Sequence, residues 1–218
     1  MTLQARPSET APSALIAAMD TLATTRLFGR DEEVYAQGAP VEHLYRLVRG
    51  VVRTTRLTAD GRRQVGDFYY AGDLLGLEVG PDHQFSAEAL TDCEVQVVRR
   101  GAVRAFAGDA AMDRAILEGI RRELERAQAH VMLLGRRSAR EKVAAFLKSM
   151  AEGCAGARGG PQPVEMPMGR QDMADYLGLT IETVSRMLTQ LQDEAVVEFP
   201  AVRRFQVKKW DRLEALAA

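Results

Sequence analysis

Residues 169–191, GRQDMADYLGLTIETVSRMLTQL, have the spacing of two short helices joined by a tight turn. Ala174 provides a small residue where such helices cross, Gly178 a glycine for the turn, and Val184 a β-branched apolar residue that faces back. Apolar residues at helical spacing form the inner side of the pair: Met173, Leu177, Leu179, Val184 and Leu188. The pattern predicts a helix-turn-helix, whose second helix can lie in the DNA major groove.

The second of these helices carries a polar face made of Glu182, Ser185 and Arg186, which point the same way because they are three and four residues apart. Glu accepts from cytosine N4, Arg binds guanine O6 and N7, and Ser reaches either type of base. The alternative is a solvated surface with an incidental Glu–Arg pair. The turn glycine, the apolar inner side and Thr180, a predicted N-cap before Ile181, favour base contacts with double-stranded DNA.

Contacts to DNA phosphates are expected near the starts of the two helices, where backbone N–H groups favour anions. The candidates are Arg170, Gln171, Thr180 and Thr183. The chain as a whole has a formal net charge of −1, so it is not a generally basic protein. Attraction to phosphates must therefore come from local clusters such as Arg203-Arg204 and Lys208-Lys209.

The run RQDMADYLGLTIETVSRML resembles the winged helix-turn-helix of the CRP/FNR family of bacterial transcription regulators, in its FixK-like and FNR-like branches. Its signature is Glu182-x-x-Ser185-Arg186, whereas the cAMP-receptor branch has Arg in place of Ile181 and Gly in place of Ser185. The resemblance covers the chain from about residue 25 onward. It implies a homodimer that reads inverted repeats similar to TTGAT-N4-ATCAA and recruits or blocks RNA polymerase.

The chain is long enough, at 218 residues and 46% hydrophobic content, to bury a sizeable core. Short β-type runs between glycine-containing turns, from about residue 34 to 98, favour a sandwich or barrel, and the resemblance implies a jelly-roll β-roll of the cyclic-nucleotide-binding type. We predict an α+β fold with four segments. These are an N-terminal arm and short helix (1–24), a β-roll effector-type domain (25–108), a dimerisation helix (109–135) and a winged helix-turn-helix domain (136–218).

Residues 109–134 are rich in Ala, Leu, Arg and Glu and contain no glycine or proline except Gly119. Apolar residues recur there at nearly the spacing of a coiled-coil seam: Ile116, Ile120, Leu124, Ala127, Val131 and Leu134. The alternative is a helix that packs only on its own β-domain. The length of the run and the need of a DNA reader for two half-sites favour a dimer interface, and the resemblance implies the same.

The positions that bind cyclic nucleotide in cAMP-binding relatives carry other residues here. A Gly-Glu-Leu turn and an Arg-Ser or Arg-Thr pair are replaced by Gly76-Leu77-Glu78 and His83-Gln84. Leucine cannot accept a ribose hydroxyl proton, and a neutral histidine is a weak substitute for a guanidinium on a phosphate. We therefore expect DNA binding without cyclic nucleotide. The open alternative is the same architecture gated by an unidentified small molecule or haem in the β-roll.

The chain has two cysteines, Cys93 and Cys154, too few for a four-ligand iron–sulfur cluster and spaced unlike a disulfide framework. Cys93 lies in an apolar run and is interpreted as a core thiol, while Cys154, in a glycine-rich loop, is the candidate for redox chemistry. His43, His83 and His130 are isolated, with no pair at ligand spacing on one helix. We predict no metal and no cofactor.

The sequence shows no nucleophile–base–orienter set, paired inward carboxylates or phosphate-binding glycine loop, so we do not expect an enzyme. It also has no apolar run of about 18 residues and no basic-then-apolar N-terminal segment. We therefore expect a cytoplasmic protein with no membrane partner.

Overall fold

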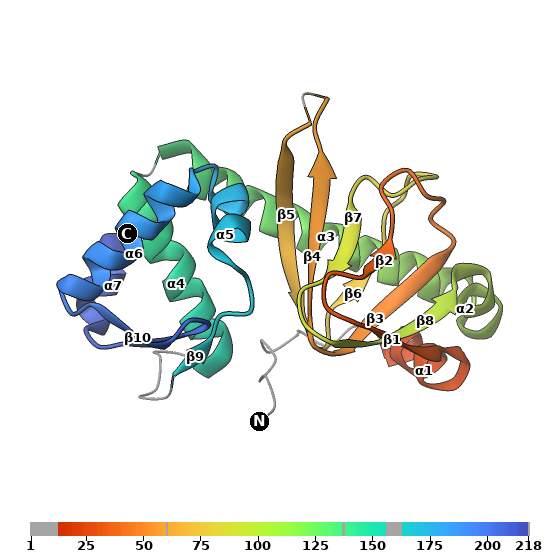
Figure 1. The fold of residues 1–218 in the computed structure, drawn as a ribbon. Coiled ribbons are helices and arrows are strands. Elements are labelled where there is room, and N and C mark those ends of the chain that lie inside the picture. Colours follow the sequence, from red (N-terminus) through yellow and green to blue (C-terminus); the bar gives the residue numbers. More distant parts are fainter. Residues whose placement is uncertain (1–12, 60, 137, 156–162, 218) are drawn as a thin grey trace. The chain divides into compact units, whose positions relative to one another are not determined.

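The computed structural model describes residues 13–59, 61–136, 138–155 and 163–217, and the first part of the expected N-terminal arm lies outside them (Figure 1). The described chain forms two compact units, one up to Ala127 and one from Gln128 to its end. The long helix α3 (Asp109–Arg136) contributes residues to both units.

The first unit is built on two antiparallel four-stranded sheets, with strand orders β1-β8-β3-β6 and β2-β7-β4-β5. The predicted β-roll is confirmed. Its strands are β1 (Thr24–Phe28), β2 (Glu33–Tyr35), β3 (His43–Arg49), β4 (Val51–Leu57), β5 (Arg63–Tyr70), β6 (Leu74–Leu75), β7 (Ser86–Ala89) and β8 (Cys93–Arg99).

Alternating side chains of these strands face inward, as in β8, where Cys93, Val95 and Val97 are buried and Glu94 and Gln96 are only partly covered. The inward side chains of both sheets form one apolar cluster between the sheets. The corner between β3 and β4 requires Gly50, whose φ is +99°. A Cβ there would lie 2.6 Å from the Cys93 sulfur, so no larger residue fits this corner.

Three helices accompany this β-roll: α1 (Ser13–Leu22), α2 (Arg100–Ala107) and the first half of α3. A second apolar cluster joins them to β3 and β8 through Leu15, Ala18, Met19, Leu44, Val98, Val103, Met112 and Ala115. Gly108, with φ +82°, ends α2, and α3 begins at the next residue. The start of α3 is therefore attached to the β-roll by buried side chains.

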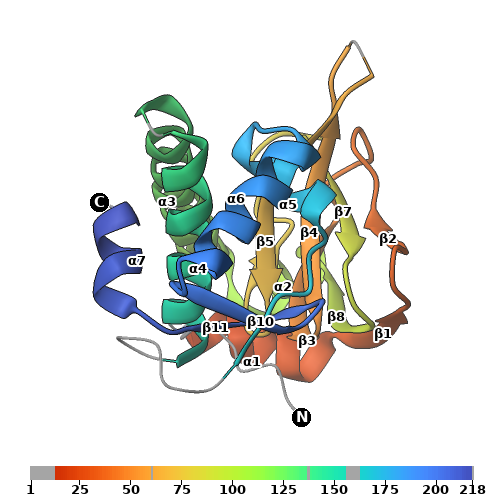
Figure 2. The same cartoon turned by 60° about the vertical axis from the view of Figure 1, so that its left-hand side comes forward.

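The second unit contains the helix-turn-helix and a three-stranded sheet of order β10-β11-β9 (Figures 1 and 2). Figure 2 shows the hairpin of β10 and β11 beside α4 and α6. The elements are α4 (Ala139–Ala155), β9 (Val164–Glu165), α5 (Arg170–Leu177), α6 (Ile181–Asp193), β10 (Val197–Ala201), β11 (Arg204–Val207) and α7 (Trp210–Ala217). The predicted winged helix-turn-helix is thus confirmed. No helix in the described parts of the chain is long and apolar enough to cross a membrane.

Candidate DNA-binding interface

The turn between α5 and α6 follows from local backbone chemistry. At the start of α5, the buried Asp172 carboxylate accepts a hydrogen bond of 3.0 Å from the Gly169 N–H. At its end, Gly178 adopts the left-handed conformation, with φ 60°, that glycine tolerates without strain. The N–H of Gly178 donates to the Ala174 carbonyl, which satisfies one of the last acceptors of α5.

Helix α6 begins at an N-cap, as the sequence predicts. The Thr180 hydroxyl oxygen accepts a hydrogen bond of 3.2 Å from the Thr183 N–H. The inner side of the helix pair is buried and comprises Met173, Ala174, Leu177, Val184, Met187, Leu188 and Leu191, whereas Leu179 is half-buried. Burial of this side leaves the opposite side of α6 for contacts with another molecule.

The outer side of α6 presents Glu182 and Arg186 as exposed residues, with Ser185 half-buried between them. Among the residues that the structure describes, Glu182 and Arg186 form no ion pair with each other. Hydrogen bonds from its own backbone N–H and from the Thr180 hydroxyl lower the pKa of Glu182. The carboxylate is therefore held ionised, the form that accepts from cytosine N4.

Thr189 extends the same outer face by one turn, four residues after Ser185, and the sequence analysis did not include it. It is exposed, and its hydroxyl donates a hydrogen bond of 3.1 Å to the Ser185 carbonyl. The i,i+4 spacing from Ser185 is the signal that identifies it.

The four expected phosphate contacts lie at the starts of α5 and α6. Arg170 and Gln171 are exposed, and the Gln171 amide donates to Asp175 Oδ1 at 2.6 Å. The hydroxyl oxygens of Thr180 and Thr183 are 3.1 Å apart at the N-terminus of α6. This arrangement offers hydroxyl and backbone N–H donors at a helix N-terminus.

The two basic clusters of the wing have intramolecular partners, which the sequence does not reveal. Arg204 pairs with Glu165 at 2.6 Å, and Lys208 pairs with Glu198 at 2.7 Å. The neighbouring cations donate to backbone carbonyls: Arg203 to Pro167 at 2.5 Å and Lys209 to Glu194 at 2.8 Å. Arg203, Arg204 and Lys208 brace the three-stranded sheet, and Lys209 binds the end of α6. Their availability for phosphates is therefore smaller than the sequence suggests.

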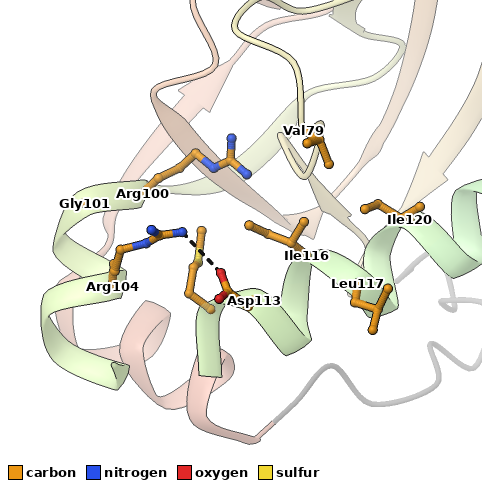
Figure 3. Close-up of a pocket in the computed structure, with 9 residues that line it drawn as sticks. Val79, Arg100, Gly101, Arg104, Asp113, Ile116, Leu117 and Ile120 are labelled. Atoms are coloured by element: carbon orange, nitrogen blue, oxygen red, sulfur yellow. Dashed lines mark hydrogen bonds and ion pairs between the residues drawn. The ribbon is translucent and has the colours of Figure 1, made fainter. Parts of the chain in front are cut away.

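The first position of the predicted seam on α3 differs from the others in its surroundings within the single chain. Ile116 is partly buried and packs against the cluster shared by α1, α2 and α3. Its neighbour Leu117 is 67% exposed. Figure 3 shows the two side chains leaving α3 in different directions, beside an open groove of about 570 Å³ that both line. The contact of α3 with its own β-roll takes Ile116 out of the exposed face and leaves Leu117 on it.

Four further seam residues are exposed in the single chain: Ile120, Leu124, Ala127 and Val131. Leu134, the last predicted position, is half-buried, with Cδ2 3.6 Å from where a Cβ on Gly178 would lie. Leu117 to Val131 thus form an unpartnered apolar row with spacings of three and four residues, which is the spacing of a heptad seam.

The residues that are expected to replace the nucleotide-binding residues of cAMP-binding relatives pack on α3 or on other side chains of the β-roll. A Cβ on Gly119 of α3 would lie 2.4 Å from Leu77 Cδ1, so Leu77 is in close contact with this helix. His83 is 1% exposed, and its ring stacks on Tyr35 at 3.8 Å. Its Nδ1 lies 2.9 Å from the Glu78 carboxylate. Neither Leu77 nor His83 presents an open polar group to a nucleotide.

A cavity of about 430 Å³ lies beside these residues, between the β-roll and α3, and is lined mainly by apolar and aromatic side chains. Its charged lining residues are Asp73, Glu78, Glu118, Glu123, Arg122 and Arg126. Both arginines are already paired, Arg122 with Glu118 at 3.0 Å and Arg126 with Asp73 at 3.1 Å. Each of the two arginines that line the cavity therefore already has a carboxylate partner.

Polar contacts join the middle of α3 to β5. Arg126 also lies 3.5 Å from Asp67 and places its guanidinium over the Tyr69 ring, 5.0 Å from the centroid. The Tyr69 hydroxyl donates to Glu123 at 3.1 Å. Burial and the Glu123 carboxylate raise the pKa of Tyr69 well above its usual value, so this hydroxyl keeps the proton that it donates.

The cysteines and histidines are placed as follows. Cys93 is buried, and burial raises the pKa of its thiol, which is the environment of an unreactive core cysteine. The backbone of Cys154 lies in the last turn of α4 and not in a loop as expected, and its side chain lies outside the described residues. His43 is half-buried, and His130 is bonded to Tyr176. The described part of the chain contains no group of three or more His, Cys, Asp or Glu side chains arranged to hold a metal ion.

A β-roll, a long helix and a winged helix-turn-helix together define a DNA-binding transcription regulator, and comparisons with known proteins give the same class. Residues 25–109 match the model of the cyclic nucleotide-binding domain, and residues 141–216 match that of the Crp-like helix-turn-helix domain. The nitrogen fixation regulation protein FixK of Azorhizobium caulinodans is 40% identical over 208 residues, covering 94% of this chain and 82% of the relative.

A second relative, FixK of Bradyrhizobium diazoefficiens, is 41% identical over 194 residues, covering 88% of this chain and 81% of the relative. The solved structure of FixK2 from Bradyrhizobium japonicum matches with a TM-score of 0.83 at 41% identity, covering 90% of this chain and 98% of that one. The chain belongs to the CRP/FNR family of transcription regulators, in its FixK-like branch. Its relatives are regulators and not enzymes.

Proposed function

We propose that this regulator acts as a homodimer on inverted repeats similar to TTGAT-N4-ATCAA and binds them without a cyclic nucleotide. Glu182, Ser185 and Arg186 contact bases, with Arg186 on the guanine and Glu182 on a cytosine. The observation that carries the proposal is the outer face of α6, where Glu182 and Arg186 are exposed and form no ion pair with each other among the described residues. If Glu182 and Arg186 were paired with each other, as on an ordinary solvated helix surface, they would not be free to bind bases.

Contacts to DNA phosphates complete the interface. We assign them to Arg170 and Gln171 at the start of α5 and to Thr180 and Thr183 at the start of α6. These residues lie at the N-terminal ends of both helices, where backbone N–H groups point outward and the helix dipole favours an anion. They position the recognition helix and do not distinguish sequences.

The homodimer is supported by the exposed row on α3. Leu117, Leu124 and Val131 are 67%, 56% and 66% exposed in the single chain. Ile120 and Ala127 lie between them at heptad spacing. Apolar side chains in this arrangement are stabilised by burial against a second copy of the same helix. The dimer supplies two recognition helices for the two half-sites of an inverted repeat.

Effector independence is supported by the packing at the nucleotide positions. Leu77 contacts α3 at Gly119, and the two arginines that line the cavity are paired with Glu118 and Asp73. A cyclic phosphate would have to compete with these carboxylates for a cationic partner. The contacts of Arg126 and Glu123 with β5 hold α3 on the β-roll without a ligand.

A second candidate function is gating of the same architecture by an apolar small molecule or haem. The cavity of about 430 Å³, with its aromatic and aliphatic lining, favours this alternative. Mass and absorbance spectra of the freshly purified protein separate the two candidates, because a retained ligand adds mass and a haem absorbs visible light.

The test of the main proposal is a selection from random duplexes with ligand-free protein, followed by binding titrations with and without millimolar cAMP or cGMP. The expected motif is a TTGAT-like inverted repeat, and its affinity is unchanged by either nucleotide. A tenfold tightening, about 1.4 kcal/mol, would refute effector independence, and an unrelated motif would refute the assigned base contacts. As a family inference, we place the protein in the cytoplasm, where it contacts RNA polymerase at its promoters.

A further inference from the structure

The C-terminal part of α3 contacts the first helix of the helix-turn-helix through one histidine. His130 Nε2 lies 2.7 Å from the Tyr176 carbonyl oxygen, and because a carbonyl only accepts, this nitrogen carries the proton and donates. The imidazole also stacks on the Tyr176 ring, with centroids 4.1 Å apart and planes 8° from parallel. The two contacts fix both the position and the rotation of the imidazole on α5.

The accepting carbonyl lies in the last turn of α5, where backbone oxygens have no partner within the helix. Lys142 of α4 donates to the next carbonyl, that of Leu177, at 3.4 Å. The ring of Phe146 in α4 also packs on Tyr176, with the two ring centroids 5.7 Å apart. The end of α5 is thus held between α3 and α4, and α5 in turn packs on the recognition helix α6.

His130 is adjacent in sequence to Val131, which belongs to the exposed row on α3. One residue corresponds to about 100° around a helix, so the two side chains occupy neighbouring faces of α3. Leu134, one turn after His130, lies on the same face as the histidine and approaches the turn at Gly178. The same two turns of α3 therefore carry the proposed dimer seam on one face and the contacts to the helix-turn-helix on the next.

We propose that His130 is a positioning residue that transmits the dimer geometry to the recognition helix and so determines which spacing between half-sites the dimer accepts. The inference rests on the proposed homodimer and inverted repeat. Adding one base pair between half-sites separates them by about 3.4 Å and also rotates them about the DNA axis. A helix-turn-helix that is fixed to α3 cannot follow that change, whereas one that has lost the His130 contacts follows it at lower cost.

The experiment compares four spacings between identical half-sites, from three to six base pairs, and a duplex that carries one half-site. The variants are His130→Phe, which keeps a ring to stack but removes the donor, His130→Gln, which keeps a donor, and His130→Ala, which removes both. Gln128→Ala, at an exposed position of α3, is the matched control. Fluorescence anisotropy gives the affinities, and sedimentation and thermal unfolding report dimerisation and folding.

We expect the wild type and Gln128→Ala to bind the four-base-pair spacing at least tenfold more tightly than the others. His130→Phe and His130→Ala should reduce this ratio severalfold while binding the single half-site as the wild type does, and His130→Gln should retain part of it. A residue that only stabilises the fold would lower the melting temperature or all affinities together and leave the ratio unchanged. That unchanged ratio in a folded, dimeric His130→Phe would overturn the inference.

The wild type distinguishes this failure from that of the proposed function. If the wild-type protein does not prefer any inverted repeat, the proposed homodimeric readout itself is wrong. If it prefers one spacing and the His130 variants keep that preference, only the role of His130 is wrong. Should His130→Ala unfold, His130→Phe and His130→Gln, which replace one planar side chain by another, decide the outcome.

Discussion

Leu77 of the β-roll and Gly119 of α3 are in such close contact that a Cβ on Gly119 would lie 2.4 Å from Leu77 Cδ1 and 3.0 Å from Leu77 Cβ. The family resemblance implies that Leu77 replaces a residue that holds the ribose in cAMP-binding relatives. At this point the Leu77 side chain lies directly against the backbone of α3.

Gly119→Ala tests this contact. The added methyl group forces Leu77 to move, so we expect a loss of about 1–3 kcal/mol in the free energy of unfolding. Leu77→Ala in the same chain should recover part of that loss, because it removes the atoms that clash. Urea unfolding measures both. Gly101→Ala is the control, since a Cβ there meets nothing within 4 Å, and a loss in that variant as large as in Gly119→Ala would show that the Leu77 contact is not its cause.

Arg186→Ala should weaken DNA binding by about 1–3 kcal/mol per half-site and relax the preference for the guanine that it contacts. The cause is the loss of a bidentate hydrogen bond to guanine. Titrations against the consensus duplex and against duplexes substituted at that base pair measure both effects. Gln192→Ala, an exposed change at the far end of α6, is expected to bind as the wild type does. An Arg186→Ala protein that keeps full base discrimination would remove Arg186 from the readout.

The pH dependence of base discrimination follows from Glu182. Because its pKa is lowered, the carboxylate stays ionised at pH values where an ordinary glutamate begins to take up a proton. Discrimination at the cytosine should therefore be constant from about pH 8 to about pH 5 and decline only as the pH falls through the lowered pKa. Thr180→Val removes one hydrogen bond to the carboxylate and should move the decline to higher pH. Glu182→Gln should show no such decline.

Val131→Asp should shift the protein from dimer to monomer, because a carboxylate in an apolar interface is costly to bury. The monomer should remain folded, since Val131 is exposed in the single chain, although loss of the dimer lowers its melting temperature. Sedimentation measures the dimer fraction. Ile116→Ala is the opposite case and should destabilise the β-roll without dissociating the dimer, because Ile116 packs on its own core. A dimer that survives Val131→Asp would place the interface elsewhere.

The sequence predicts local structure well where a short pattern determines it. Gly178, the Thr180 cap and the apolar spacing around Val184 give the helix-turn-helix, because each acts within one or two turns of chain. Ile116 and Leu117 could not be distinguished in this way. Both fit a helical repeat, and only the packing of α1 and α2 on α3 decides which of them is covered.

Contacts between distant residues were beyond prediction for the same reason. The bonds of Arg204 with Glu165 and of His130 with Tyr176 join residues 39 and 46 positions apart. A charge or a ring in the sequence does not reveal its partner until strands and helices bring the two together. The sequence therefore suggests that the basic clusters of the wing are available to DNA phosphates, whereas the structure gives them partners in the protein.

Those partners bear on how the protein responds to ionic strength. The binding of a cationic side chain to a DNA phosphate weakens as salt is added, because it releases counterions from the DNA and this release becomes less favourable at high salt concentration. Arg204 and Lys208 already neutralise Glu165 and Glu198, so moving either onto a phosphate leaves a carboxylate exposed near the DNA and yields little net attraction. Occupancy of the operator should accordingly decline less steeply with salt than the number of lysines and arginines in the second unit implies, which favours recognition by base contacts over attraction to any DNA.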